Sequence, residues 1–332
     1  MRPMPTMLLV LATAPVEAAP TATTFDVPGS KSTTVGAVSK SGIVAGTYKP
    51  ASHDPCGKVC GFLRMPDATF TTFTIFRAVD AGINAINDDG TAVGFYRTGP
   101  WDQGFIRTPD GAIAKIKNGD LFTTAVDVND SGIALGETTV DSSFRGILRT
   151  PDGRLSRFKV KRCQHTIPSG IDATDTVIGT CLRNSAEHGF LRQADGTTTL
   201  FDPPGTDLSY GQAIDDSGAI AGLYFDAGNN LDAYLRDADG TFHLFSVASQ
   251  PQAIGVSAMA NVGGEMQVVG NVEVQDRSLG FVYRSGTVET FDIAGGTTGG
   301  AGTTVAGIAA SGTIAGSYSE DGKVWHGYIR TP

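Results

Sequence analysis

The sequence has little charge, no basic segment and no long apolar run. Of its 332 residues, 18% are charged, and 25 Lys and Arg against 34 Asp and Glu leave a net charge of −9. Proteins that bind nucleic acid concentrate positive charge against the phosphate backbone, so we expect no nucleic-acid partner. A helix that crosses a membrane needs about 20 apolar residues. No segment approaches that length, so we expect no membrane partner.

The sequence also lacks the short motifs that mark many enzymes. It contains no Gly-x-Ser-x-Gly, no zinc signature, no phosphate-binding loop and no dinucleotide-binding fingerprint. No segment keeps a 3.6-residue apolar period, so little helix is expected. These absences remove several enzyme classes and predict a chain made almost entirely of strands.

The N-terminus has the composition of a secretion signal. Arg2 precedes an apolar run from Met7 to Val16, and small residues follow at Ala18 and Ala19. We expect residues 1–19 to be a signal peptide and residues 20–332 to be a single domain. The mature protein is expected to be secreted or periplasmic.

Glycine is abundant, with 43 residues, and much of it belongs to an internal repeat. One marker of the repeat runs from an Asn/Asp-rich turn to a glycine, and these glycines lie 42 to 48 residues apart: Gly46, Gly94, Gly136, Gly179, Gly222, Gly270 and Gly316. The second marker, close to Gly-Phe-Leu-Arg, keeps step with the first and ends at Arg64, Arg107, Arg149, Arg192, Arg236, Arg284 and Arg330. Two markers in phase indicate seven modules of about 44 residues.

Each module contains four short apolar runs separated by turn sequences. In the third module the expected strands, a to d, are residues 125–128, 133–136, 146–149 and 155–158. Asn129-Asp130-Ser131-Gly132 and Thr150-Pro151-Asp152-Gly153 are tight-turn sequences between them. Four strands per repeat of this length predict the blades of a β-propeller.

The two ends of the chain complement each other. The last module stops at Pro332 before its fourth strand, and the mature N-terminus begins with Thr23-Thr24-Phe25-Asp26, which matches a fourth strand. We therefore predict an all-β, seven-bladed propeller of four-stranded blades, closed by the N-terminal strand in the last blade. Closure removes exposed sheet edges. An open solenoid of the same repeats is the alternative.

The modules resemble the bacterial extracellular HAF-repeat family, named for a His-Ala-Phe triplet before strand c. The triplet occurs here as His188-Gly189-Phe190 and His326-Gly327-Tyr328, and elsewhere only its Gly-Phe part is kept. The resemblance covers Phe25 to the C-terminus. It implies export and a β fold built from propeller-type repeats. It supplies no catalytic residues, since members of the family are mostly uncharacterised.

Antiparallel strands sort the loops onto two faces of such a fold. The a–b and c–d turns are short and share one face, whereas the d–a and b–c loops share the other and hold most of the sequence variation. Function usually resides on variable loops held by a rigid scaffold, so we expect this variable face to be the working surface. Strand a positions toward the axis are mostly small, which predicts a channel with few acids and bases.

All four cysteines are expected at the variable face. In an exported protein they predict two disulfides, Cys56–Cys60 and Cys163–Cys181. A metal site of Cys56, Cys60 and His53 is the alternative, but it lacks a fourth ligand, so no metal site is predicted. The seven repeated arginines could bind anions. A residue required once per module is usually structural, so we expect each to bond to a turn or an Asp of its neighbour.

Residues that break the repeat are the candidates for function. Exposed aromatic and acidic side chains would contact a sugar or a partner protein, and the expected binding residues are Trp101, Asp207, Tyr210, Asp226 and Trp325. His165 and Tyr210, with Arg162 nearby, are the catalytic candidates, because a lyase removes a proton beside a uronate carboxylate. The loop from Asp226 to Asp232 is the best calcium candidate, although no cofactor is otherwise expected.

The sequence favours a secreted, monomeric binding module that recognises an extracellular carbohydrate or protein through its variable face. The alternative is a polysaccharide-degrading enzyme, a lyase or a glycoside hydrolase, with its site at the channel mouth. A glycosidase would need two carboxylates roughly 5–10 Å apart, for which Asp207 and Asp226 are possible members. A structural surface protein without a small ligand is a third possibility, since propellers host many functions.

Overall fold

The computed structural model describes residues 20–52, 55–116, 122–248, 251–293, 295 and 302–332. The predicted signal peptide and His53 therefore lie outside the described residues. Within these ranges the chain forms 28 strands and no helix. Consequently, the described part of the chain contains no helix long and apolar enough to cross a membrane. The all-β class predicted from the sequence is confirmed.

Five sheets have four antiparallel strands in chain order. They are formed by β2 (Ser30–Val38), β3 (Val44–Pro50), β4 (Cys60–Arg64) and β5 (Phe70–Thr74); β6 (Asp80–Ile86), β7 (Ala92–Arg97), β8 (Asp102–Arg107) and β9 (Ile113–Ile116); β10 (Thr123–Val128), β11 (Ala134–Val140), β12 (Ser143–Arg149) and β13 (Leu155–Phe158); β14 (His165–Ile171), β15 (Val177–Arg183), β16 (Ala186–Arg192) and β17 (Thr198–Phe201); β18 (Ser209–Ile214), β19 (Ile220–Phe225), β20 (Leu231–Arg236) and β21 (Phe242–Phe245). Each sheet corresponds to one module of the repeat.

The sixth sheet has eight strands. It contains β22 (Ala253–Val262), β23 (Glu265–Val274), β24 (Arg277–Arg284), β25 (Thr287–Phe291), β26 (Gly302–Ile308), β27 (Ile314–Ser319), β28 (His326–Thr331) and the N-terminal β1 (Thr21–Phe25). A single parallel pair, Ser278 with Gly302, joins β22–β25 to the rest of the sheet. β1 pairs antiparallel with β28, from Thr21 opposite Thr331 to Phe25 opposite Gly327.

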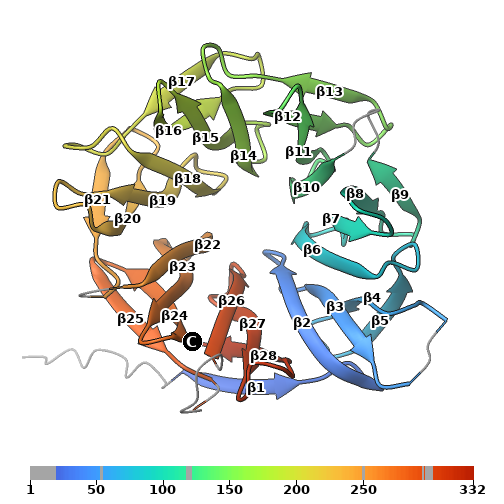
Figure 1. The fold of residues 1–332 in the computed structure, drawn as a ribbon. Coiled ribbons are helices and arrows are strands. Elements are labelled where there is room, and N and C mark those ends of the chain that lie inside the picture. The colour runs from blue at the N-terminus through green and yellow to red at the C-terminus, as the bar shows by residue number, and fades with distance from the viewer. Residues whose placement is uncertain (1–19, 53–54, 117–121, 249–250, 294, 296–301) are drawn as a thin grey trace, which may run out of the picture.

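The sheets are arranged around a common centre, with β2, β6, β10, β14, β18, β22 and β26 innermost (Figure 1). The first and last sheets also touch. The backbone N–H of Thr33 on β2 donates to the carbonyl of Trp325, 2.8 Å away, and that of Val35 donates to Oγ of Ser317 on β27 at 2.7 Å.

Every innermost strand carries a β-bulge at the same point. The register shifts between Val35 and Ala37, Ile83 and Ala85, Ala125 and Asp127, Pro168 and Gly170, Gly211 and Ala213, Val256 and Ala258, and Val305 and Gly307. A bulge leaves one residue outside the ladder and redirects its neighbours. Side chains at these bulges reach the next sheet: Asn84 donates to the carbonyl of Ala125 at 2.7 Å, and Gln212 accepts from the N–H of Val256 at 2.8 Å.

The repeated glycines allow the two inner strands and an aromatic ring to approach closely. A Cβ built on Gly46 would lie 2.1 Å from the carbonyl oxygen of Thr34 and 2.7 Å from the ring of Phe62. The ring at the corresponding place is completely buried in most modules, as at Phe105, Phe190, Tyr234, Phe281 and Tyr328. Burial of such a ring contributes about 2–3 kcal/mol each, so the glycine and the aromatic residue of the two markers form one packing unit.

The repeated arginines join neighbouring sheets. In four cases the guanidinium lies 4.8 to 5.2 Å from the centre of a phenylalanine ring on the outermost strand of the preceding sheet: Arg64 over Phe25, Arg107 over Phe73, Arg192 over Phe158 and Arg236 over Phe201. Arg330 lies 4.6 Å from Phe291 in the same way within the eight-stranded sheet. Such cation–π contacts contribute about 0.5–1 kcal/mol when exposed and more when desolvated. The expected bond to a turn is present as well, because Nη1 donates to the carbonyl of the residue that follows the arginine, at 3.2 to 3.5 Å, in Arg64, Arg107, Arg149, Arg192 and Arg236.

Candidate functional site

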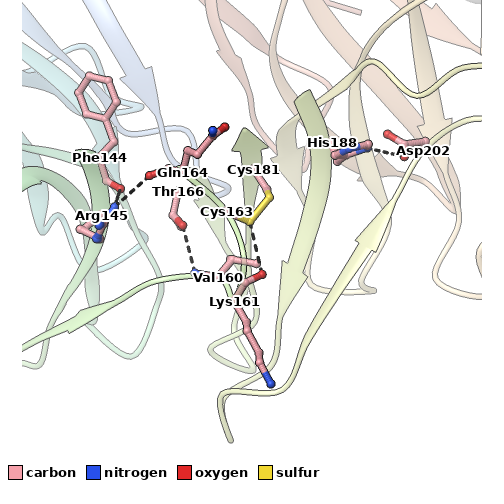
Figure 2. The surroundings of a disulfide bond; sticks show 10 residues. All are labelled: Phe144, Arg145, Val160, Lys161, Cys163, Gln164, Thr166, Cys181, His188 and Asp202. Carbon is pink, nitrogen blue, oxygen red and sulfur yellow. Dashed lines mark hydrogen bonds and ion pairs between the residues drawn. A yellow bond between two sulfur atoms is a disulfide. The ribbon is translucent and has the colours of Figure 1, made fainter. Parts of the chain in front are cut away.

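The structure places both predicted cysteine pairs at disulfide distance. The Cα atoms are 5.7 Å apart in Cys56–Cys60 and 5.5 Å apart in Cys163–Cys181. Figure 2 shows the second pair, which ties the loop after β13 to β15. Both of its cysteines are buried, and the nearby N–H of Val160 donates to the hydroxyl of Thr166 at 3.0 Å. This disulfide fixes the start of β14 on the variable face.

The three catalytic candidates lie near the start of innermost strands, but each has its own partners. Nδ1 of His165 accepts the backbone N–H of Phe144 at 3.2 Å, which places the proton of a neutral imidazole on Nε2. The Tyr210 hydroxyl donates to Oε2 of Glu187 at 2.5 Å. Arg162 is exposed in the loop before β14. Among the contacts found for the described residues, none joins Arg162, His165 and Tyr210 to one another.

The environment of Tyr210 opposes a role as a general base at neutral pH. Burial of the phenol, together with its hydrogen bond to the carboxylate of Glu187 and the charge of that carboxylate, raises the pKa of Tyr210 to about 12. A phenol with this pKa is protonated at pH 7 and can donate but not accept a proton.

The expected binding residues divide into exposed and structural ones. Trp101, at the tip of the loop between β7 and β8, is 52% exposed, and Asp207 is exposed in the loop before β18. Trp325 is half-buried and joins the last sheet to the first through its backbone, because its main-chain N–H donates to Oγ of Ser32 at 3.0 Å. Trp101 and Asp207 are therefore exposed enough to contact a ligand, while the backbone of Trp325 connects the last sheet to the first.

Asp226 caps its own loop. Its carboxylate accepts the backbone N–H groups of Gly228 and Asn230 at 2.8 and 2.7 Å, and the side-chain amide of Asn230 as well. The Asn230 side chain and these backbone groups lower the pKa of Asp226. In the ranges that the structure describes, no group of three or more His, Cys, Asp and Glu is placed to hold a metal ion.

The variable face has an open groove between the first two sheets. Its volume is about 480 Å³, and its lining includes Lys58, Arg77 and Val79. Val79 is 51% exposed, and its N–H donates to the carbonyl of Arg97 on the hairpin that carries Trp101. These lining residues were not predicted from the sequence. No sequence signal marks them, because the bend beside the groove contains no glycine, Asn or Asp: Phe76 and Arg77 have φ of 47° and 53°, a left-handed conformation that such residues adopt rarely.

A larger cavity, of about 600 Å³, opens on the opposite face. It is lined by the second halves of the innermost strands and by the turns that follow them, including Lys40, Asp88, Asp130 and Asp216. Among the strand residues that line the cavity only Asp127 is charged, as the small strand positions predicted, and the other charged residues lie on the turns, which that expectation did not cover. Asp88 and Asp216 do not cap their own turns, because each reaches the turn of another sheet: Asp88 accepts the N–H of Ser41 at 2.7 Å and Asp216 that of Ala173 at 3.0 Å. They also form the rim of the cavity.

Lys40 reaches across the mouth of this cavity. Its ammonium lies 2.8 Å from Oδ2 of Asp130 and 2.5 Å from Oδ2 of Asp216, on turns of the β10–β13 and β18–β21 sheets. Burial acts to lower the pKa of Lys40, but the two carboxylates outweigh it, so the pKa is raised. The ammonium also helps to lower the pKa of Asp130 against the opposing effect of burial.

Asp127 lies in the cavity wall, at the bulge of β10. Its carboxylate accepts the N–H groups of Val128 and, on the next sheet, Ile171, both at 2.8 Å. The side chain is partly exposed to the cavity, and desolvation by the surrounding protein raises the pKa of Asp127 to about 6.

No protein-family model matches the sequence, and no curated protein matches it. Solved structures do resemble the fold. A catalytically inactive virginiamycin B lyase from Staphylococcus aureus, crystallised with quinupristin, has a TM-score of 0.64 at 16% identity, over 95% of this chain and 100% of that one. A streptogramin B lyase structure gives 0.63 at 11% identity, over 94% and 98%.

A third similar structure is the β-propeller domain of the trilobed protease from Pyrococcus furiosus, described as having an open velcro topology. It has a TM-score of 0.57 at 12% identity and covers 90% of this chain and 95% of that domain. At these identities the likeness establishes a β-propeller fold for this chain and nothing about its activity.

Proposed function

We propose that the protein is an exported seven-bladed β-propeller that binds an extracellular carbohydrate through its variable face without changing it chemically. The blade count is supported by the seven innermost strands with equivalent bulges. Ring closure is supported by β1 on β28 and by the hydrogen bonds between β2 and the last sheet. The two disulfides support a location outside the cytoplasm.

The groove between the first two sheets, together with Trp101 on the hairpin that contacts its edge, carries the proposal. A tryptophan that is half-exposed at a loop tip offers an aromatic face to a sugar ring, and it stands on the hairpin whose backbone holds Val79 at the groove edge. Lys58 and Arg77 add two positive charges to the lining. The Cys56–Cys60 disulfide stiffens the loop that carries Lys58.

The charge of the groove favours an acidic polysaccharide. The whole chain has a net charge of −9, yet the charged residues that line the groove are both basic. Basic side chains in a cleft attract carboxylates or sulfates of a ligand, and Arg binds them in bidentate fashion. A polymer with acidic groups beside apolar ring faces would match the combination of Lys58, Arg77 and Trp101.

A polysaccharide lyase or glycoside hydrolase is the competing function. The lyases among the structural neighbours share a propeller scaffold with this chain, which shows that the fold can accommodate elimination chemistry. The separate environments of His165 and Tyr210 weigh against that function for the residues first considered.

Size-exclusion chromatography of acidic and neutral polysaccharides, after incubation with the mature protein, distinguishes the binding function from the enzymatic one. We expect an acidic polymer to co-elute with the protein at unchanged length, and Trp101→Ala and the Lys58→Ala/Arg77→Ala pair to weaken binding about tenfold each. Lys323→Ala, an exposed lysine before β28, is the matched control and should bind normally. Shortening of a polymer would replace the binding proposal with the enzymatic one, and no co-elution with any polymer would overturn both.

A further inference from the structure

The variable face carries a second concentration of positive charge, away from the groove. Residues 153–171 contain five Lys and Arg and no Asp or Glu, in a chain whose net charge is −9. Apolar and polar residues separate these cations, so they do not form a continuous basic segment. Three of them, Lys159, Lys161 and Arg162, are exposed in residues 159–164, the loop between β13 and β14. We call this segment the basic loop.

Contacts with two sheets fix the basic loop. The Cys163–Cys181 disulfide joins it to β15. The backbone N–H of Gln164 donates to the carbonyl of Leu182, also on β15, at 2.7 Å. The carbonyl of Gln164 accepts from Nη1 of Arg145, on β12 of the preceding sheet, at 3.2 Å (Figure 2). Arg145 therefore brings a fourth positive charge against a loop whose backbone is already held in place.

The basic groups have no acidic counterpart within the protein. Arg183 follows Leu182 on β15 and adds a fifth cation beside the loop. Glu187 pairs with Leu182 from the other side, but its carboxylate accepts the hydroxyl of Tyr210. In the described ranges no carboxylate lies within ion-pair distance of Arg145, Lys159, Lys161, Arg162 or Arg183. Like charges gathered without a counter-charge repel one another, and an anionic ligand would remove that cost.

An aromatic side chain lies next to these cations. Phe144 directly precedes Arg145 and is partly exposed, and its ring centre lies 5.4 Å from that of His165, the first residue of β14. An acidic sugar presents both an apolar ring face and carboxylate or sulfate groups, which match an aromatic ring beside arginines. A lipid surface needs only a flexible basic segment, whereas this loop is fixed, so the arrangement favours a polysaccharide.

We propose that the basic loop, with Arg145 and Arg183, binds the acidic groups of a polysaccharide at a second site on the variable face. The guanidinium groups bind sulfates or carboxylates in bidentate fashion. Lys161 extends from the side of the loop opposite Arg145 (Figure 2), and it and Lys159 add attraction at longer range. This site shares its class of ligand with the proposed function but none of its residues, so either can fail without the other.

The test uses dextran sulfate and uncharged dextran, which differ only in the acidic groups. In isothermal titration calorimetry at low salt, we expect dextran sulfate alone to bind. The Arg162→Asn/Arg183→Gln pair should weaken this binding about tenfold. Asn suits position 162 because Arg162 has a φ of 67°, which Asn adopts more readily than most residues.

The control pair is Arg154→Gln/Lys323→Gln. It removes the same charge from two other exposed positions, one of them in the short turn before β13 on the opposite face, and it should bind dextran sulfate normally. Equal weakening by the control pair would reduce the effect to net charge and overturn the proposal. Failure of dextran sulfate to bind, or equal binding of dextran, would overturn it as well.

The groove variant Lys58→Ala/Arg77→Ala separates the two sites. Binding of dextran sulfate that this variant loses and Arg162→Asn/Arg183→Gln keeps would place the anion in the groove, which contradicts the second site and leaves the proposed function standing. The reverse pattern would support the second site. Sedimentation with phosphatidylglycerol vesicles examines a lipid partner. Vesicle binding that requires Arg162 and Arg183, without binding of dextran sulfate, would overturn the choice of a polysaccharide.

Discussion

Nδ1 of His188 on β16 lies 2.8 Å from Oδ2 of Asp202, the residue directly after β17 (Figure 2). His326 on β28 and Asp26 after β1 repeat this pair at 2.8 Å. These are the two complete His-Gly-aromatic triplets of the sequence. The histidine of the triplet therefore connects the third strand of a unit to the end of its outermost strand, which is a structural role.

Removal of these histidines should destabilise the fold in proportion to their burial. The side chains of the His188–Asp202 pair are 18% and 23% exposed, against 35% and 45% for His326–Asp26. We expect His188→Ala to lower the free energy of unfolding by about 1 kcal/mol and His326→Ala by about 0.5 kcal/mol. Urea denaturation measures both. A larger loss for His326→Ala would contradict the burial argument.

The N-terminal strand should stabilise the whole ring. Phe25 on β1 belongs to the last sheet, yet its ring centre lies 6.3 and 6.0 Å from those of Phe62 and Phe70 on the first sheet. Phe25→Ala should cost about 2–3 kcal/mol, somewhat less than a fully buried phenylalanine. Deletion of residues 20–29 should lower the Tm much further, because it also opens the edge of β28. A truncated protein with the Tm of the full chain would refute closure by β1.

The two disulfides should contribute unequally to stability. The Cys163–Cys181 bridge closes a loop with a sequence separation of 18, and Cys56–Cys60 one of only 4. Loop-closure entropy predicts losses of about 3 and about 2 kcal/mol, respectively, when each pair is replaced by alanine. Thermal unfolding of the two double variants measures both losses. Equal losses would contradict this order.

Much of the fold could be predicted from the sequence because the signal repeats. Strands expected at residues 125–128 and 155–158 are found within β10 and as β13, and both disulfide pairings were predicted. The lining of the cavity could not be predicted in this way. The bulge between Ala125 and Asp127 shifts the side-chain alternation by one residue, so simple alternation does not show which residues of β10 face inward.

The ion pair between Lys40 and Asp216 was equally invisible to sequence reasoning. The two residues are 176 positions apart and lie in turns whose sequences are fully explained by turn capping. The length of the repeat and the residues of its turns specify the structure of each module by itself. The distance across the ring depends on how many modules close it and at what angle, and no local pattern contains that information.

Asp127 makes the cavity sensitive to pH. An ordinary Asp has a pKa near 3.8, and desolvation in the wall raises the pKa of Asp127 to about 6. Between these values the folded protein holds a proton that the unfolded chain has released, so the contribution of this group to stability falls as the pH rises. Two pKa units correspond to about 3 kcal/mol. The free energy of unfolding of the unsubstituted protein, relative to that of Asp127→Asn, should therefore decrease by about that amount from pH 4 to pH 7.

The carboxyl carbon resonance of Asp127 in an NMR titration gives the same pKa directly. We expect a midpoint near pH 6, whereas Asp226 should titrate below the ordinary range of an aspartate because of its hydrogen bonds. The positive charge of Lys40 favours the ionised form of Asp127, so Lys40→Met should move the Asp127 midpoint upward and leave that of Asp226 in place. A midpoint near 4 for Asp127 would show that water enters the wall of the cavity. A midpoint that Lys40→Met lowers would show that the ammonium does not lie over the cavity.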